Sequence, residues 1–265
     1  MTADSGRLAV EEVDGVLVLR LDRPVRRNAM NQALADSLST AIDRLESAPG
    51  LRAGVLTGSD TVFSAGTDLS LPSGPRTAAG GEYGFVRRVR SKPLVAAVEG
   101  PAVGGGFEMV LACDLVVASS TASFALPEVK RGVVANCGAL FRAPARLPAA
   151  LAMELLLTGD PMTAERAHGA GLVNVLCEPG GAVAGALALA RRIAVNSPAA
   201  VAATLSAMSK ARAEAEERAW AFTAMADEEA HRSADRAEGI AAFFEKRAPR
   251  WAVGPAGTGP RPDET

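Results

Sequence analysis

The chain has 265 residues, 48% hydrophobic and 22% charged, which is enough apolar material for one large α/β domain with or without a small appendage. Its 28 Lys and Arg against 30 Asp and Glu give a net charge of −2, which argues against a broad nucleic-acid-binding surface but allows a local basic patch for a phosphorylated ligand. The start of the chain has no signal-peptide pattern and no apolar run reaches membrane-spanning length, so we expect a cytoplasmic protein without a membrane partner.

The cysteines, Cys113, Cys137 and Cys177, are odd in number and form no CxxC pair. This pattern is typical of buried thiols in a reducing compartment and offers no disulfide framework or zinc site. We therefore expect no bound metal.

Short strands alternate with helices in the first half of the chain. Residues 7–24 contain two β-like runs joined by Asp14-Gly15, a pair that tolerates the positive φ angles of a tight hairpin. Leucine and isoleucine side chains three and four residues apart predict an amphipathic helix over 31–47. Further short strands are predicted at 53–58, 94–100 and 114–119. The alternation indicates a buried sheet layered by helices.

The second half of the chain is mainly helical. Helices are predicted at 148–160, 182–196, 198–213, 213–233 and 234–248, and a short helix followed by a strand at 163–176. We divide the chain into an α/β core (1–195), a helical C-terminal region (196–252) and a Gly/Pro-rich tail (253–265) that we expect to be disordered. Residues 71–84 are turn formers and predict a long loop.

Three glycines, Gly104, Gly105 and Gly106, open a predicted helix just after a strand. The first amides of a helix have no internal partner and lie at the positive end of its dipole. The spacing fits neither a Walker motif nor a dinucleotide loop. Two interpretations stay open on the glycines alone: an oxyanion site, or close packing of helix against strand. The "FSAGTDL" turn at 63–69 could supply a second amide donor or be an ordinary surface turn.

Two carboxylates stand in apolar surroundings. Glu108 falls in the first turns of the predicted helix, where an exposed Glu would be favoured by the helix dipole but a buried one costs several kcal/mol unless it is protonated or paired. Glu128 lies behind Leu126-Pro127, and a salt bridge to Lys130 or Arg131 is the alternative to a catalytic role. Two such carboxylates beside an oxyanion site would suit acid–base work on an activated carbonyl compound.

The other titratable groups have weaker patterns. His168 and His231 lack ligand spacing and are interpreted as ordinary helix residues, Ser64 lacks a nucleophile elbow, and nothing marks a base for Cys137. The arginines at 26 and 27 are either surface residues or anion contacts.

Together these segments identify a resemblance. "RPVRRNAMN", "FSAGTDL", "VAAVEGPAVGGGFEMVLACDL", "SFALPEVKRG", "LLLTGDPMTAERAHGAGLVNVL" and "AAFFEKRAP" resemble, in order and spacing, the enoyl-CoA hydratase/isomerase (crotonase) superfamily over roughly residues 8 to 250. The resemblance implies an α/β fold, a crotonase (ClpP-like) spiral of ββα units, and a helical C-terminal region that trimerises, often as a dimer of trimers. It implies an acyl-CoA thioester as the ligand. Coenzyme A is then part of the substrate, and no separate cofactor is expected.

The resemblance also implies the catalytic residues. The amides of Thr67 and Gly105 match two oxyanion-hole donors for the thioester oxygen, and Glu108 and Glu128 match the glutamate pair of hydratases. By this pattern Glu108 activates the water that attacks C3, and Glu128 protonates C2. Apolar surroundings would raise at least one of the two pKa values towards ~6–7, where proton transfer is practical near neutral pH.

A wider set of positions matches CoA-binding residues of the family. These are Arg26, Arg27, Ala65, Asp68, Leu69, Gly104, Phe243 and Lys246. In the family the arginine position contacts the CoA phosphates and the segment at 65–69 holds the adenine and pantetheine parts. The last two resemble a pair that reaches CoA from a neighbouring subunit.

The chain departs from the family pattern at residues 135–139. The usual Pro-x-x-Gly-Gly is "ANCGA" here, which leaves the backbone near Glu128 open, and Asn136 stands where some isomerases and dehalogenases carry a catalytic aspartate. An amide cannot be that base or nucleophile. The first hypothesis is therefore an enoyl-CoA hydratase-type lyase, the second a Δ3,Δ2-enoyl-CoA isomerase that uses mainly Glu128, and the third a non-catalytic acyl-CoA-binding protein. "FFEKRAPRW" and "LPEVKRG" also resemble a branch with carnitinyl-CoA dehydratase-like proteins, so the acyl group need not be a plain fatty chain.

Overall fold

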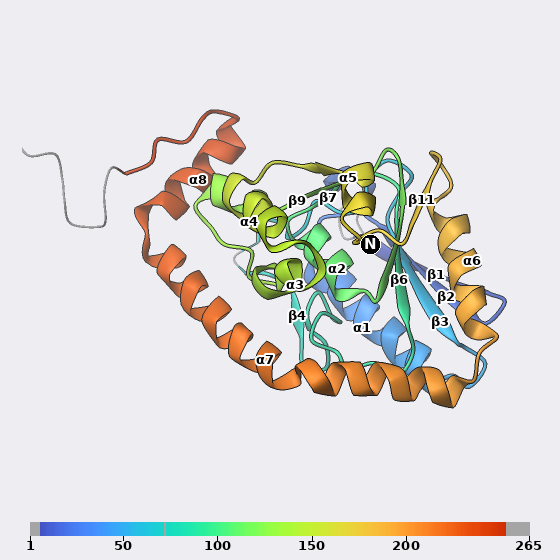
Figure 1. Ribbon diagram of the computed structural model, residues 1–265. Helices are drawn as coiled ribbons and strands as arrows, with labels where there is room; N and C mark the ends of the chain where they lie inside the picture. The colour runs from blue at the N-terminus through green and yellow to red at the C-terminus, as the bar shows by residue number, and fades with distance from the viewer. Residues whose placement is uncertain (1–5, 72, 253–265) are drawn as a thin grey trace, which may run out of the picture.

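A computed structural model describes residues 6–71 and 73–252 and shows an α/β core with a long, bent helix that runs below it and then up one side in Figure 1. The tail predicted to be disordered, 253–265, lies outside the described residues. Within these residues no helix is both long enough and apolar enough to cross a lipid bilayer.

The elements follow in chain order. The strands are β1 (Arg7–Val13), β2 (Val16–Asp22), β3 (Ala53–Thr57), β4 (Arg76–Thr77), β5 (Gly81–Glu82), β6 (Leu94–Val98), β7 (Ala102–Val103), β8 (Leu115–Ser119), β9 (Ser123–Ala125), β10 (Met162–Thr163) and β11 (Val175–Cys177). The helices are α1 (Gln32–Ser47), α2 (Gly105–Ala112), α3 (Ala139–Arg146), α4 (Ala149–Thr158), α5 (Ala164–Gly169), α6 (Ala182–Ala194), α7 (Pro198–Arg232) and α8 (Ala234–Glu245), with 3-10 turns η1 (Pro24–Arg26) and η2 (Pro127–Arg131).

The main sheet has the strand order β1-β2-β3-β6-β8-β11. The first pair is antiparallel and every later pair is parallel. Asp14 and Gly15, with φ of 50° and 75°, form the predicted hairpin turn. The predicted hairpin, the helix over 31–47 and the three short strands are thereby confirmed.

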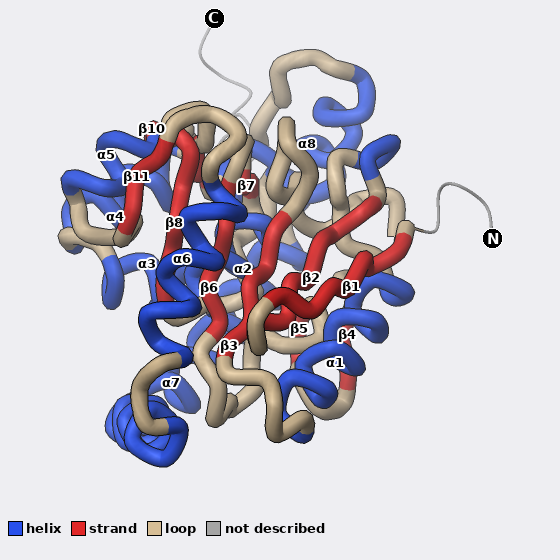
Figure 2. The backbone as a smooth tube through the Cα atoms, turned by 90° about the vertical axis from the view of Figure 1, so that its right-hand side faces the viewer, coloured by secondary structure: helices blue, strands red, loops and turns tan. Residues whose placement is uncertain are grey.

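Alternate side chains of β2 pack into two different cores. Leu17 and Leu19 are buried with the apolar side chains of α1 on one face of the sheet. Val16 and Val18 are buried on the other face with Ala182, Ala186 and Ala190 of α6, which crosses the strands in Figure 2. Successive side chains of a strand point to opposite faces of the sheet, so β2 contributes to both cores. Alanines four residues apart lie on one face of α6 and let this helix pack closely on the sheet, which gives three layers.

A second, smaller sheet lies beyond the ends of the main strands. After β6 the chain forms the short β7 and then α2, and after β8 it forms the short β9, which pairs with β7 in parallel and with β10 in antiparallel. This is the predicted spiral of ββα units. Single bridges extend it: Ser64 pairs with Ala102, and Met30 with Thr67. The segments that carry the candidate site therefore meet at this smaller sheet.

The C-terminal region differs from the prediction in one respect. The helices predicted at 198–213 and 213–233 are one continuous 35-residue helix, α7. Its only proline is Pro198 in the first turn, and it contains no glycine, so nothing in the sequence stops it. The loop predicted at 71–84 contains the small hairpin β4–β5. Helix α8 returns to pack against η2 of the same chain (Figure 1).

Candidate active site

The glycine run forms the entry to α2, as predicted. Gly104 has φ of 57° and precedes the helix, and the amide of Gly105 has no acceptor in the described part of the chain. A Cβ on Gly105 would overlap the hydroxyl of Tyr83, and one on Gly106 would overlap the carbonyl oxygen of Ser64. The glycines therefore serve close packing and also leave an amide without an acceptor at the positive end of a helix, so the packing interpretation is confirmed and the oxyanion site stays a prediction.

The "FSAGTDL" turn lies directly beside this entry. The amide of Val103 donates to the Ser64 carbonyl at 2.9 Å, and a Cβ on Gly66 would lie 2.7 Å from the nitrogen of Gly105. The amide of Thr67 has no acceptor among the described residues. The fold thus brings together two unpaired amides, those of Thr67 and Gly105, which the sequence predicts as a pair of donors.

Glu108 is buried one turn into α2, with 2% of its surface exposed. Its Oε1 atom accepts hydrogen bonds from the amides of Cys137 (2.8 Å) and Ala139 (3.0 Å). Burial, and next the nearby charge of Glu128, raise the pKa of Glu108 to about 8, although the two amides favour the ionised form. A group that is protonated and deprotonated near neutral pH suits acid–base chemistry.

Glu128 faces the same place from η2. A Cβ on Gly104 would lie 3.0 Å from its Oε1 atom, while its Oε2 atom is buried and has no hydrogen-bond partner among residues 6–71 and 73–252. Burial raises the pKa of Glu128 to about 7. Neither expected salt bridge forms: Lys130 pairs with Asp160 at 2.5 Å, and Arg131 lies over the ring of Phe243, 4.6 Å from its centroid. The charge of Arg131 still acts on Glu128 and opposes the rise of its pKa.

From the sequence we expect the unusual segment at 135–139 to lie near Glu128. In the structure this segment instead donates hydrogen bonds to Glu108. Gly138, with φ of 111°, turns the backbone so that the amides on either side of it, Cys137 and Ala139, donate to one carboxylate oxygen. The missing proline and the alanine at 139 leave both donors in place. The side chain of Asn136 donates to Asp227 of α7 at 3.1 Å.

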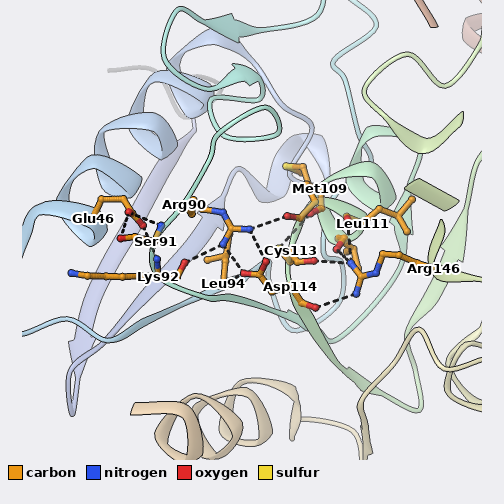
Figure 3. Close-up of polar contacts among 12 residues, drawn as sticks. Glu46, Arg90, Ser91, Lys92, Leu94, Met109, Leu111, Cys113, Asp114 and Arg146 are labelled. Carbon is orange, nitrogen blue, oxygen red and sulfur yellow. Dashed lines mark hydrogen bonds and ion pairs between the residues drawn. The ribbon is translucent and has the colours of Figure 1, made fainter. Parts of the chain in front are cut away.

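Helix α3 donates hydrogen bonds to two places on α2, the side chain of Glu108 in its first turns and the carbonyl groups at its C-terminal end. Its first amide, that of Ala139, binds Glu108, and its last residue, Arg146, donates to the carbonyl oxygens of Leu111 (3.1 Å) and Cys113 (2.7 Å) at the other end of α2 (Figure 3). From the opposite side Arg90 donates to the Ala112 carbonyl (3.1 Å). Cations at these carbonyls complement the helix dipole, so the helix that carries Gly105 and Glu108 is fixed in position.

The residues expected to bind CoA differ in surroundings. Arg26 and Arg27 are exposed, and the carbonyl of Arg27 accepts a hydrogen bond from Ala65 at 3.0 Å, which places these arginines beside the turn. Asp68 is buried and pairs with Arg23 at 2.7 Å. Burial raises the pKa of Asp68, but hydrogen bonds from Ser70 and Arg23 outweigh it and the pKa is lowered. Its carboxylate therefore anchors the turn.

The C-terminal pair lies at the end of α8. The ring of Phe243 is under the Arg131 guanidinium of the same chain, and Lys246 is exposed with φ of 55°. The pair therefore lies close to η2, which carries Glu128. A contact from a neighbouring subunit stays a prediction.

Sequence reasoning missed Tyr83. It lies at the end of the turn-rich loop, is the single tyrosine of the chain, and has 1% of its surface exposed. Its hydroxyl is 2.7 Å from Oγ1 of Thr67 and accepts a hydrogen bond of 3.3 Å from Sγ of Cys137. A lone aromatic residue among glycines was the only signal. No group of three or more His, Cys, Asp or Glu in residues 6–71 and 73–252 is arranged to hold a metal ion.

Two carboxylates with raised pKa values, one buried and one half-buried, lie beside two amides that have no acceptor among the described residues, a set of groups that suits acid–base chemistry on an activated carbonyl compound. The enoyl-CoA hydratase/isomerase family model matches residues 11–254, and the chain belongs to that family. It is 37% identical to the mevalonyl-coenzyme A hydratase of Aspergillus fumigatus (89% of this chain, 91% of that one). It is 36% identical to an enoyl-CoA hydratase of Mycobacterium tuberculosis (94% and 98%). The solved structure of a carnitinyl-CoA dehydratase from Mycobacterium avium superposes with a TM-score of 0.87 at 40% identity (93% and 99%).

These relatives share the crotonase fold and hydro-lyase chemistry. Both predictions, the fold class and the hydratase type of enzyme, are confirmed.

Proposed function

We propose that this hydratase adds water reversibly across the 2,3 double bond of a 2-enoyl-CoA thioester, with Glu108 and Glu128 as its acid–base pair. The observation that supports this assignment is the placement of the two glutamates. Both have raised pKa values; Glu108 is buried one turn into α2, and Glu128 is half-buried against Gly104 at the entry to that helix, next to the unpaired Gly105 amide.

The amides of Thr67 and Gly105 would bind the thioester oxygen. Attack of water at C3 moves negative charge onto that oxygen, and two backbone donors placed beforehand stabilise it without reorganising. Each donor of this kind contributes roughly 3–4 kcal/mol in comparable sites. Both amides are unpaired in the described part of the chain, so they are available for this role.

The two glutamates would divide the proton transfers. The raised pKa values let the pair exchange protons near neutral pH, and the reactive form is the one in which Glu108 is ionised and Glu128 is protonated. In that form Glu108, oriented by the Cys137 and Ala139 amides, takes a proton from the attacking water. Glu128 delivers a proton to C2 from its buried, unpartnered carboxyl oxygen. In the reverse reaction, dehydration, Glu128 acts as the base that removes the proton from C2 and Glu108 as the acid that protonates the leaving hydroxyl, as microscopic reversibility requires.

The ligand, the assembly and the compartment belong to the same proposal. Coenzyme A enters as part of the substrate, with its phosphates near Arg26 and Arg27. The chain forms a homotrimer or a dimer of trimers in the cytoplasm. The apolar side chains that α7 exposes, those of Met208, Phe222 and Met225, support association through the C-terminal region.

A turnover screen tests the proposal. Loss of the conjugated enoyl absorbance is followed with crotonyl-CoA and with longer, branched, hydroxylated and carboxylated enoyl-CoAs, because the relatives are named for different acyl groups. The proposal predicts hydration of at least one, and its loss in Glu108→Gln. Absence of hydration across the panel, together with an unchanged Glu108→Gln, would contradict it. Isomerase activity retained in Glu108→Gln would favour a Δ3,Δ2-enoyl-CoA isomerase that uses Glu128.

A further inference from the structure

We propose that the hydroxyl of Tyr83 is a positioning group that sets the Thr67 and Gly105 amides in their mutual arrangement. The inference rests on the proposed function, because it assigns those amides to the thioester oxygen. It adds a residue from the loop after β5 to a site otherwise built from α2, η2, the turn at 63–69 and the segment at 135–139.

The hydroxyl lies between the two donor residues. It is 2.7 Å from Oγ1 of Thr67, and it occupies the space that a side chain on Gly105 would need. One oxygen atom thus touches both residues whose amides are unpaired. Removing it frees the Thr67 side chain and leaves a gap beside the Cα atom of Gly105.

The same hydroxyl is linked to the segment that holds Glu108. The Cys137 thiol lies 3.3 Å from it and equally 3.3 Å from Oδ1 of Asn136, so its one proton is shared between these two acceptors, and the amide of Cys137 donates to Glu108 at 2.8 Å. Thr67, Tyr83 and Cys137 therefore form a continuous series of contacts from the oxyanion donors to the carboxylate. Linked polar groups in a buried site restrict one another's positions.

The backbone of Tyr83 is strained to make this contact. Its φ is 52°, in the left-handed region that a residue with a side chain rarely adopts, and its amide donates to the Pro75 carbonyl at 3.0 Å. Gly84 follows with φ of 84°, where a Cβ would overlap the carbonyl of Ala35. Such strained residues cluster at functional sites. The hydroxyl is thus held by its own loop.

The test uses a chromophoric ligand, dimethylaminocinnamoyl-CoA, whose absorbance moves to longer wavelength when its thioester carbonyl is polarised. Tyr83→Phe keeps the ring and removes the hydroxyl. We expect a smaller red shift of the bound ligand and a fall in kcat of about tenfold, the effect of one lost hydrogen bond, with KM nearly unchanged. A merely structural role would not move the spectrum.

Thr67→Ala removes the other hydroxyl of the same contact, Oγ1 of Thr67, and keeps the backbone amide. It should reproduce the loss, the double variant should lose no more than either single one, and Thr67→Ser should restore it. A control is Thr57→Ala, which removes a buried hydroxyl bonded to the Ala97 carbonyl at 2.9 Å on β3. Its spectrum should match that of the wild type.

The outcomes separate the inference from the function on which it rests. A wild-type red shift that persists in full in Tyr83→Phe and Thr67→Ala overturns the inference alone. Additive losses in the double variant also overturn it, because they would make the hydroxyl an independent donor. Absence of a red shift in the wild type overturns the oxyanion assignment and the inference with it.

Discussion

The amide of Cys137 donates a hydrogen bond of 2.8 Å to Oε1 of Glu108, across 29 residues of sequence. The contact exists because Gly138 bends the backbone and directs a second amide, that of Ala139, to the same oxygen. A carboxylate that would otherwise be costly to bury is thereby oriented for reaction.

The free energy of unfolding should fall as pH rises through the range in which the buried glutamates ionise. The folded state raises the pKa of Glu108 from 4.5 to about 8, so between these values the folded state binds more protons than the unfolded state. Stability from this group is full below pH ~4.5 and is lost up to pH ~8, at a rate of up to roughly 1.4 kcal/mol per pH unit.

Urea unfolding of wild type and Glu108→Gln at a series of pH values measures how the free energy of unfolding depends on the ionisation of Glu108. The difference between the two free energies should change in favour of the glutamine variant as pH rises, because glutamine does not ionise. A pH-independent difference would mean that Glu108 ionises normally in the folded protein.

Gly138→Ala should destabilise the protein by about 1–3 kcal/mol and lower hydration activity. An alanine at φ of 111° is strained, and its Cβ would lie 3.3 Å from the ring of Trp220. The matched control is Gly50→Ala, at ordinary φ with no atom within 4 Å of the new Cβ. Denaturant midpoints compare the two, and equal midpoints would show that the turn at 138 is not required.

Arg146→Met should cost about 1–3 kcal/mol of stability, because it leaves carbonyl groups at the end of α2 without donors. Arg166→Met is the control, since that arginine forms a solvent-exposed pair with Glu154 that contributes little to stability. Thermal unfolding compares the Tm values of the two variants, and Arg146→Met should have the lower Tm. If the two arginines are equivalent, the anchoring of α2 by α3 is wrong.

Tyr83 gives a spectroscopic check on burial because the chain has no other tyrosine. Burial, and next the charges of Cys137 and Glu108, hold the pKa of Tyr83 well above 10. Tyrosinate absorbance should therefore develop only when the chain unfolds in alkali, as followed in parallel by circular dichroism. Ionisation with an ordinary midpoint in the folded protein would place the hydroxyl in water.

Local patterns were enough to predict much of this molecule. Asp14-Gly15 specifies a turn by its own backbone preferences, and Leu34 and Leu38 identify the buried face of α1 by their spacing. Glu108 and Glu128 could be selected as candidate residues because each stands in apolar sequence and matches a motif of the family. What escaped prediction depends on contacts between distant segments or on backbone direction: the hydroxyl of Tyr83 on Thr67, and the amide of Cys137 on Glu108. No side-chain pattern encodes an amide that points at a carboxylate.

The most direct test compares kcat for hydration in Glu108→Gln, Glu128→Gln and the double variant, on the best substrate of the screen. Because both carboxylates act in the same addition, each single variant should lose at least about a hundredfold, the lower range for a positioned acid or base. The double variant should lose far less than the product of the two losses. Near-wild-type hydration by either single variant, in a protein shown to be folded, would contradict the assignment of the two glutamates as the acid–base pair.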